Sequence, residues 1–145
     1  MSQLKNKSIP QKFRLVCKST TKDLCKVENL IRKISNKCKL DDGSTYRLLV
    51  ASTEAVNNAI THGNKGDLKK EIIIDVVIYR RKVVLKVKDQ GMGFDPAIIP
   101  DPRKEENLLK ESGRGVFLIH SLMDDVKYLK TKTGMIVEMS MKCPK

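Results

Sequence analysis

Aromatic residues are scarce in this chain of 145 residues: tryptophan is absent, and phenylalanine and tyrosine together make up 4% of the sequence. A hydrophobic core must therefore rest on Ile, Val, Leu and Met. No apolar run approaches the length that crosses a membrane, and residues 1–7 are polar and basic, unlike a secretory leader. We therefore expect a cytoplasmic protein with no membrane partner.

Cysteine occurs at four positions, but none of them belongs to a Cys-x-x-Cys pair or has a histidine nearby. That spacing argues against a structural zinc site. Cys25 and Cys38 fall on or near the apolar face of a predicted helix, so we expect them to be buried thiols in a reducing cytosol. A chain of this length can bury a core without covalent cross-links.

Acidic residues are outnumbered, because 29 Lys and Arg stand against 17 Asp and Glu, a formal net charge of +12. Basic domains often bind nucleic acids or acidic proteins. Here the basic residues are scattered, with clusters only at 69–70 and 80–82, and few aromatic residues could stack on bases. We expect no direct nucleic-acid partner, and attribute the charge to solubility and to attraction of an anionic nucleotide and an acidic protein.

Hydrophobic periodicity predicts alternating helices and strands within one domain. The strands are expected at 13–17, 71–79, 83–88, 126–130 and 135–141, and the basic residues 80–82 form a hairpin tip. Helices are expected after a cap at 19–23, after a break at 41–45, and from Val116. The pattern predicts an α+β domain over 13–142, with tails at 1–12 and 143–145. It is a two-layer sandwich in which helices cover one face of a mixed, largely antiparallel sheet.

Three motifs carry the candidate chemistry, and the first is Glu54-Ala-Val-Asn-Asn58-Ala-Ile-Thr-His62-Gly63. Residues three and four apart share a helix face, so Glu54, Asn58 and either Thr61 or His62 form a polar ridge. The opposite, apolar side is expected to be buried. The ridge is either a solvated surface or a site, in which the Asn58 amide oxygen binds Mg²⁺ and Glu54 accepts a proton from an attacking hydroxyl or water.

The second motif, Asp89-Gln-Gly91-Met-Gly93-Phe, follows the predicted strand 83–88. Gly91 and Gly93 permit positive φ and leave no side chain between the backbone and a ligand. Asp89 either accepts a hydrogen bond from an exocyclic amino group, such as that of adenine, or bonds its own backbone in an ordinary turn.

The third motif, Gly113-Arg-Gly115-Val-Phe-Leu, leads into the predicted helix. Glycines directly before a helix leave bare amide groups at its positive end, where a phosphate is favoured. Without a ligand the same residues would be an ordinary helix entry, and Arg114 either contacts phosphates or faces solvent. The proline-containing segment 95–112 suits either a lid over a nucleotide or a surface loop.

Taken in order, the motifs resemble the N box, first glycine box and second glycine box of the histidine-kinase-like ATPase superfamily, which includes DNA gyrase and sensor kinases. The resemblance is closer to the small bacterial anti-sigma-factor serine/threonine kinases. Their Glu-Ala-x-x-Asn-Ala-x-x-His-Gly, Asp-x-Gly-x-Gly-Phe, Gly-Arg-Gly and Leu-Met-Asp-Asp-Val runs have counterparts at 54–63, 89–94, 113–115 and 122–126. The resemblance extends over about residues 13–141 and implies a Bergerat-type ATP-binding fold.

This resemblance implies an ATP-dependent protein serine/threonine kinase that acts as an anti-sigma factor and uses ATP and Mg²⁺. Its partners would be a sigma factor and a small antagonist protein that it phosphorylates, and a homodimer is possible. Glu54 would be the catalytic base and Asn58 the magnesium ligand. The nucleotide-binding residues would be Asn58, His62, Asp89, Gly91, Gly93, Gly113, Arg114 and Gly115. The alternative is a nucleotide-binding module that sequesters a regulatory partner without transferring phosphate.

Overall fold

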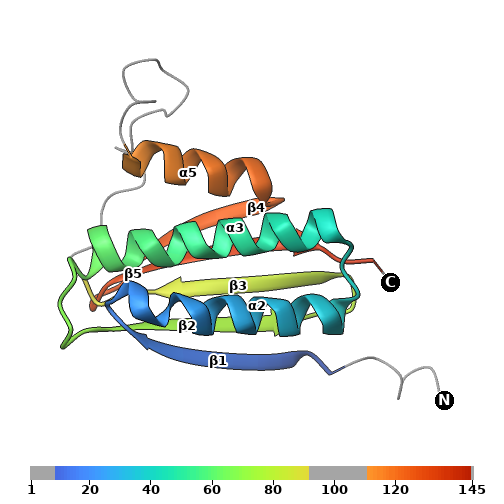
Figure 1. The fold of residues 1–145 in the computed structure, drawn as a ribbon, viewed down its shortest axis with the longest axis horizontal. Coiled ribbons are helices and arrows are strands. Elements are labelled where there is room, and N and C mark those ends of the chain that lie inside the picture. The colour runs from blue at the N-terminus through green and yellow to red at the C-terminus, as the bar shows by residue number, and fades with distance from the viewer. Residues whose placement is uncertain (1–8, 92–110, 145) are drawn as a thin grey trace.

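A computed structural model describes residues 9–91 and 111–144 of the chain (Figure 1). The strands in this part form a five-stranded sheet in the order β1-β2-β3-β5-β4. They are β1 (Gln11–Lys18), β2 (Glu71–Ile78), β3 (Lys82–Lys88), β4 (Asp125–Lys130) and β5 (Met135–Lys142). Every neighbouring pair is antiparallel. The expected α+β class and largely antiparallel sheet are confirmed, and no parallel pair occurs among the described strands. Short hairpins join β2 to β3 and β4 to β5, which favours antiparallel pairing there.

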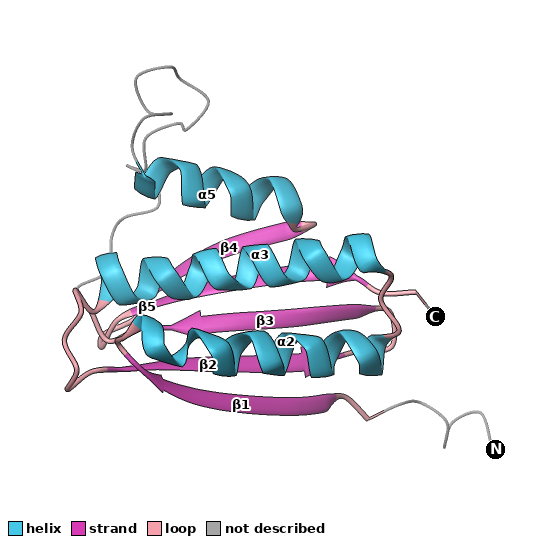
Figure 2. Cartoon of the chain, in the orientation of Figure 1, coloured by secondary structure: helices cyan, strands magenta, loops and turns pink. Residues whose placement is uncertain are grey.

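The helices form a single layer on one face of the sheet (Figure 2). They are α2 (Leu24–Cys38), α3 (Asp42–Asn58) and α5 (Glu111–Leu122). A short 3-10 turn, η1 (Thr21–Asp23), precedes α2, and a π-helical turn, η2 (Ala59–Gly63), extends α3. No helix in the described ranges is long and apolar enough to cross a bilayer. The predicted sandwich with helices on one face is therefore confirmed.

Side-chain caps open η1 and α3, whereas α2 follows η1 without a side-chain cap of its own. The Thr20 side chain accepts a hydrogen bond from Lys22 N at 3.4 Å and opens η1, within the expected cap. Asp41 Oδ1 accepts one from Ser44 N at 2.6 Å and starts α3 at Asp42. The expected break at 41–45 is therefore wrong beyond its first residue, because a capping aspartate satisfies the free amide groups of the first turn.

The core lies between the helix layer and the sheet, and none of its buried side chains in the described ranges is aromatic. One row of paired residues shows how the strands supply it: Phe13, Val76, Leu85, Met139 and Val126 follow one another across the sheet. The three central members of this row are at most 1% exposed. The predicted core of Ile, Val, Leu and Met is confirmed.

The position of each cysteine around α2 decides whether its side chain is buried. Cys38 is buried, as expected, whereas Cys25 is exposed. Val27, Ile31 and Ile34 form the buried stripe of α2. Cys25 lies two residues before Val27, and two residues rotate a side chain about 200° around a helix. The expected burial of Cys25 is therefore wrong.

The opposite face of the sheet carries a row of alternating charge. Arg14 is paired with Asp75, which faces Lys86, which faces Glu138. Arg14 Nε lies 2.7 Å from Asp75 Oδ1, and Lys86 Nζ lies 3.6 Å from Glu138 Oε1. A hollow of about 360 Å³ lies beside this row on β1 to β3. Its one carboxylate, Asp75, is already bound by Arg14 and Lys88, so we do not assign the candidate chemistry to it.

Candidate functional site

The three motifs meet at the end of the molecule where α3 finishes, α5 starts and β3 ends, on the left in Figure 1. Two close approaches between glycines and other segments establish this meeting. Gly115 of α5 lies against the side chains of Glu54 and Asn58, and Gly91 lies against the backbone of Gly63. Residues far apart in sequence are therefore brought together at one end of the molecule.

Glu54 and Asn58 project from the last turns of α3 and are half-buried. A Cβ atom built on Gly115 would stand 3.0 Å from Glu54 Oε2 and 3.3 Å from Asn58 Nδ2. Among the described residues, neither side chain has a hydrogen-bond or ion-pair partner. The missing side chain of Gly115 lets α5 approach this carboxylate and amide, and both lack a partner among the described residues, which favours a binding site over a merely solvated ridge.

The second glycine box lies within α5, since that helix begins at Glu111. The expectation that both of its glycines directly precede the helix is wrong, because glycine lowers helix propensity without forbidding a helix. The amide of Gly113 lies near the start of the described helix, at the end where the helix dipole favours an anion. Gly115 acts differently: its missing side chain lets α5 approach α3. The Arg114 side chain, Gly93 and the segment 92–110 lie outside what the structure describes.

Asp89 occupies a half-buried position directly after β3. Its backbone N–H donates to Met135 O at 2.9 Å, and its Oδ1 accepts from Gly91 N at 2.9 Å. The predicted turn bond is therefore present, and it leaves further acceptor capacity on the carboxylate for a ligand. The pKa of Asp89 lies above its ordinary value, because the effect of burial outweighs the hydrogen bonds from the N–H groups of Gly91 and Met135 and the charge of Lys70, which lower the pKa.

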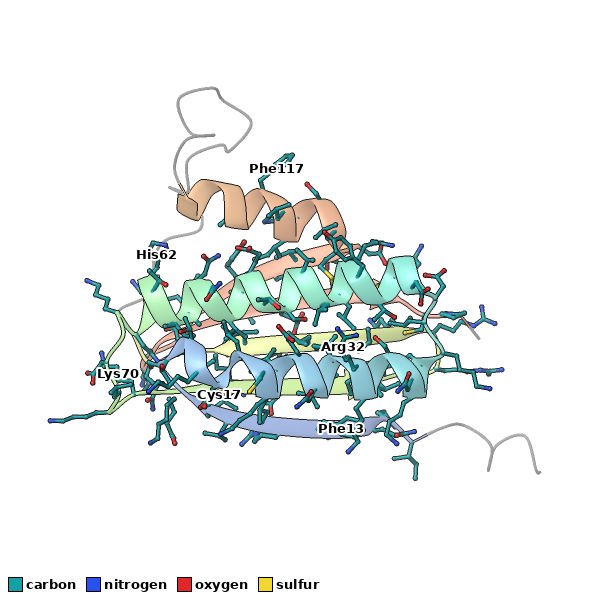
Figure 3. All side chains as sticks on the ribbon, in the orientation of Figure 1. Phe13, Cys17, Arg32, His62, Lys70 and Phe117 are labelled. Atoms are coloured by element: carbon teal, nitrogen blue, oxygen red, sulfur yellow. The ribbon has the colours of Figure 1, made fainter. Side chains whose placement is uncertain are left out.

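His62 is exposed at the end of the π-helical turn η2, and Figure 3 shows it at the same end of the molecule as Lys70. Thr61 is also exposed. Because a π-turn is wider than an α-turn, side chains beyond Asn58 no longer keep the α-helical spacing. The continuation of the ridge through Thr61 or His62 therefore stays a prediction.

Three residues that received no individual role from the sequence shape the surroundings of Asp89. A Cβ atom on Gly63 would overlap the Asp89 carboxylate, and one on Gly134 would overlap the Asp89 carbonyl group. Asn64 is 1% exposed, and its Oδ1 accepts a hydrogen bond from the N–H of Gln90, the residue that follows Asp89. Gly134 lies in the β4–β5 turn and approaches Asp89 only because β3 pairs with β5, so no local pattern could have revealed it.

Comparisons with known proteins identify a family for this chain. The family model of the histidine kinase-like ATPase domain matches residues 17–141. The serine-protein kinase RsbW of Oceanobacillus iheyensis is 33% identical over 113 residues, which cover 74% of this chain and 71% of that protein. RsbW of Staphylococcus aureus strain Newman is 37% identical over 109 residues, 68% of each chain. RsbW of Listeria monocytogenes serovar 1/2a is 37% identical over 86 residues, but that match spans only 55% of either protein.

A crystal structure of the RsbU and RsbW domains of a Mycobacterium tuberculosis protein has a similar fold. The TM-score is 0.68 at 15% sequence identity, and the match covers 93% of this chain and 33% of that one. At that identity the likeness concerns the fold alone. The family model covers most of the chain. This chain therefore belongs to the family of histidine kinase-like ATPase domains, with the RsbW serine-protein kinases among its relatives.

Proposed function

We propose that this chain is an ATP-dependent protein serine/threonine kinase that also acts as an anti-sigma factor. The observation that supports this most directly is the contact of Gly115 with Glu54 and Asn58, which joins the acid and amide of one motif to the glycines of another. Relatives named as serine-protein kinases support the same class of reaction.

Asn58 is the residue we assign to Mg²⁺. Among the described residues there is no group of three or more His, Cys, Asp or Glu that could hold a metal ion. One amide oxygen nevertheless fits this ion, because Mg²⁺ commonly binds one or two protein oxygens and completes its octahedron with phosphates and water. When bound, it supplies positive charge that offsets the charge developing on the phosphates.

Glu54, one helical turn from Asn58, is the group we assign to accept the proton of the attacking serine or threonine hydroxyl. Phosphoryl transfer requires mainly that the hydroxyl be positioned and that charge be stabilised. A half-buried carboxylate with no partner among the described residues is available for that proton.

Asp89 is proposed to accept a hydrogen bond from the amino group of adenine, so that the nucleotide is ATP. Gly91, Gly93, Gly113 and Gly115 would let the backbone approach the nucleotide, as the family resemblance implies. His62 and Arg114 are proposed to lie near the phosphates, which fits their motif positions.

The proposed partners are a sigma factor and a small antagonist protein whose serine or threonine receives the phosphate, in a partner-switching system of the cytoplasm. A homodimer is a further proposed assembly. The relatives' names support the kinase part of this proposal, and the net charge of +12 suits acidic partners. The alternative, a nucleotide-gated module that only sequesters its partner, differs in one respect: it transfers no phosphate.

An assay of phosphate transfer distinguishes the kinase from the module that only sequesters its partner. The parent, Glu54→Gln and the control Glu28→Gln are incubated with ATP labelled on the γ-phosphate and with the antagonist recovered from the native cell by affinity capture. Glu28 is exposed on α2, so its substitution makes the same change in charge away from the site.

We expect Glu54→Gln to slow labelling of the antagonist about a hundredfold while nucleotide binding persists, because general-base catalysis contributes about 10²- to 10⁴-fold. Glu28→Gln should label like the parent. A parent that binds ATP but labels no serine or threonine would contradict the kinase proposal and support the sequestering module.

A further inference from the structure

Asn64 has a side chain whose hydrogen-bonding groups are all used within the protein. Its Nδ2 donates to Ser19 Oγ at 2.8 Å and to Glu71 O at 3.0 Å, and its Oδ1 accepts from Gln90 N at 2.7 Å. The side chain is buried, since the residue is only 1% exposed. It therefore connects the β1–η1 junction, the start of β2 and the loop after β3.

Only an amide on a short side chain satisfies these three partners. Gln90 N–H can only donate and Glu71 O can only accept, which fixes the orientation of the amide. An aspartate would retain the acceptor but lose both donors, and an alanine would lose all three bonds. A buried group left without its partner destabilises the arrangement that it was part of.

The backbone of Asn64 is fixed to the helix that carries Asn58. Its N–H donates to Ala59 O at 2.8 Å, which closes the π-helical turn η2. Lys65 and Gly66 then take left-handed conformations, with φ of 53° and 71°, and turn the chain toward β2. The position of the Asn64 amide is thereby tied to the last turns of α3.

The residue that Asn64 holds, Gln90, lies between Asp89 and Gly91. The Gln90 side chain is fixed as well, because its Oε1 accepts from Glu71 N at 2.7 Å. Gly91 in turn packs against the Gly63 carbonyl group, directly before Asn64. Both the side chain and the N–H of Gln90 are therefore held, between Asp89 and the Gly91 N–H that donates to the Asp89 carboxylate.

We propose that Asn64 is a positioning residue for base recognition: by holding the Gln90 N–H, it orients the Asp89 carboxylate relative to the helix that carries Asn58. Asn64 itself contacts no nucleotide. The inference rests on the proposed role of Asp89 as the acceptor for the adenine amino group. It adds a specificity determinant at a residue for which motif and family gave no role.

The test compares ATP with inosine triphosphate, which has a carbonyl oxygen where adenine has its amino group. The ratio of the two affinities, measured by titration calorimetry with Mg²⁺, reports on recognition of the base edge that carries the amino group, where Asp89 is proposed to bind. We expect the parent to prefer ATP, and Asn64→Ala to lower that preference about tenfold through weaker ATP binding, with little change for inosine triphosphate. If Asn64 only supported the fold, its replacement would weaken the binding of both nucleotides equally.

Two matched variants identify which bond matters. Asn64→Asp keeps an oxygen acceptor for Gln90 N–H and should retain most of the preference, although it is less stable. Ser19→Ala removes one partner of Nδ2 but leaves the bond to Gln90, and should also retain it. If Asn64→Ala does not unfold cooperatively, Asn64→Ser takes its place, because its hydroxyl lies too close to the backbone to replace the amide.

The outcomes are distinguishable. A parent that prefers ATP, together with an Asn64→Ala protein that prefers it equally, overturns this inference and leaves the adenine role of Asp89 intact. If Asn64→Ala loses the same factor of affinity for both nucleotides, the inference is also overturned. A parent that binds the two nucleotides equally contradicts the role of Asp89 itself, and the inference fails with it.

Discussion

Replacing Gly115 by alanine separates the stability of the fold from the function of the site. The new Cβ atom would stand 3.0 Å from Glu54 Oε2 and 3.3 Å from Asn58 Nδ2. Ordinary van der Waals contacts begin a few tenths of an ångström farther out, so these two side-chain ends must move. The substitution thus displaces the two groups assigned to the proton and to the metal ion.

Two effects on stability oppose each other. Alanine favours a helix over glycine by about 1 kcal/mol, and Gly115 lies inside α5. Overpacking costs about 1–3 kcal/mol, and the lower end applies here because the displaced atoms are the ends of side chains. The net change in the free energy of unfolding should therefore stay within about 2 kcal/mol.

Function should respond far more strongly. Misplacing reacting groups by about 1 Å can cost about a hundredfold in rate, so we expect at least a tenfold loss of Mg²⁺-dependent ATP affinity or of phosphate transfer. Thermal unfolding by circular dichroism and calorimetric titration with ATP, both on the same preparation, measure the two effects.

Gly43→Ala is the matched control, because it makes the same change in the first turn of α3, where the nearest atom lies at 3.6 Å. It should stabilise the fold by about 0.5–1 kcal/mol and leave ATP binding unchanged. A folded Gly115→Ala protein that binds ATP and transfers phosphate like the parent would refute the reasoning.

Three further predictions concern single positions. Gly63→Ala places a methyl group where the Asp89 carboxylate lies, so the preference for ATP over inosine triphosphate should disappear; an unchanged preference contradicts the packing. The hydrogen bond from Arg14 lowers the pKa of Asp75. The ionised Asp75 carboxylate therefore stabilises the folded protein fully at neutral pH, and this stabilisation is lost as the pH falls below about 4. Asp75→Asn should accordingly show a shallower loss of melting temperature between about pH 5 and 2, whereas an equally steep loss contradicts this. The exposed Cys25 should react with a thiol reagent faster than the other cysteines, and Cys25→Ser should remove this fast phase; its persistence assigns the fast phase elsewhere.

Local patterns are sufficient to predict most of the fold. Alternating side chains identify strands, so the run Val83 to Lys88 predicts β3 to within one residue of its start at Lys82. Hairpin tips follow from turn residues flanked by apolar runs. The helix starts are harder to predict, because a capping aspartate and the residues of a first turn resemble a loop in sequence. Asp42 therefore falls in the predicted break although it begins α3.

The site is predictable in its members but not in its contacts. Motif residues such as Glu54 and Asp89 can be selected because their types and spacings fit nucleotide chemistry. That Gly115 faces Glu54 depends on how α5 packs on α3, and that Gly134 faces Asp89 depends on strand pairing. Such long-range approaches leave no local signal.

The central claim, that the end of α3 is a Mg²⁺-dependent ATP site, is tested most directly by calorimetric titration of ATP into the parent, Asn58→Ala and Asn57→Ala, each with Mg²⁺ and with a chelator. Asn57 is also half-buried, but it lies one residue away on the same helix and faces another direction. We predict that the parent and Asn57→Ala bind ATP more tightly with Mg²⁺, and that Asn58→Ala loses this gain. Equal gains from Mg²⁺ in all three proteins would contradict the account.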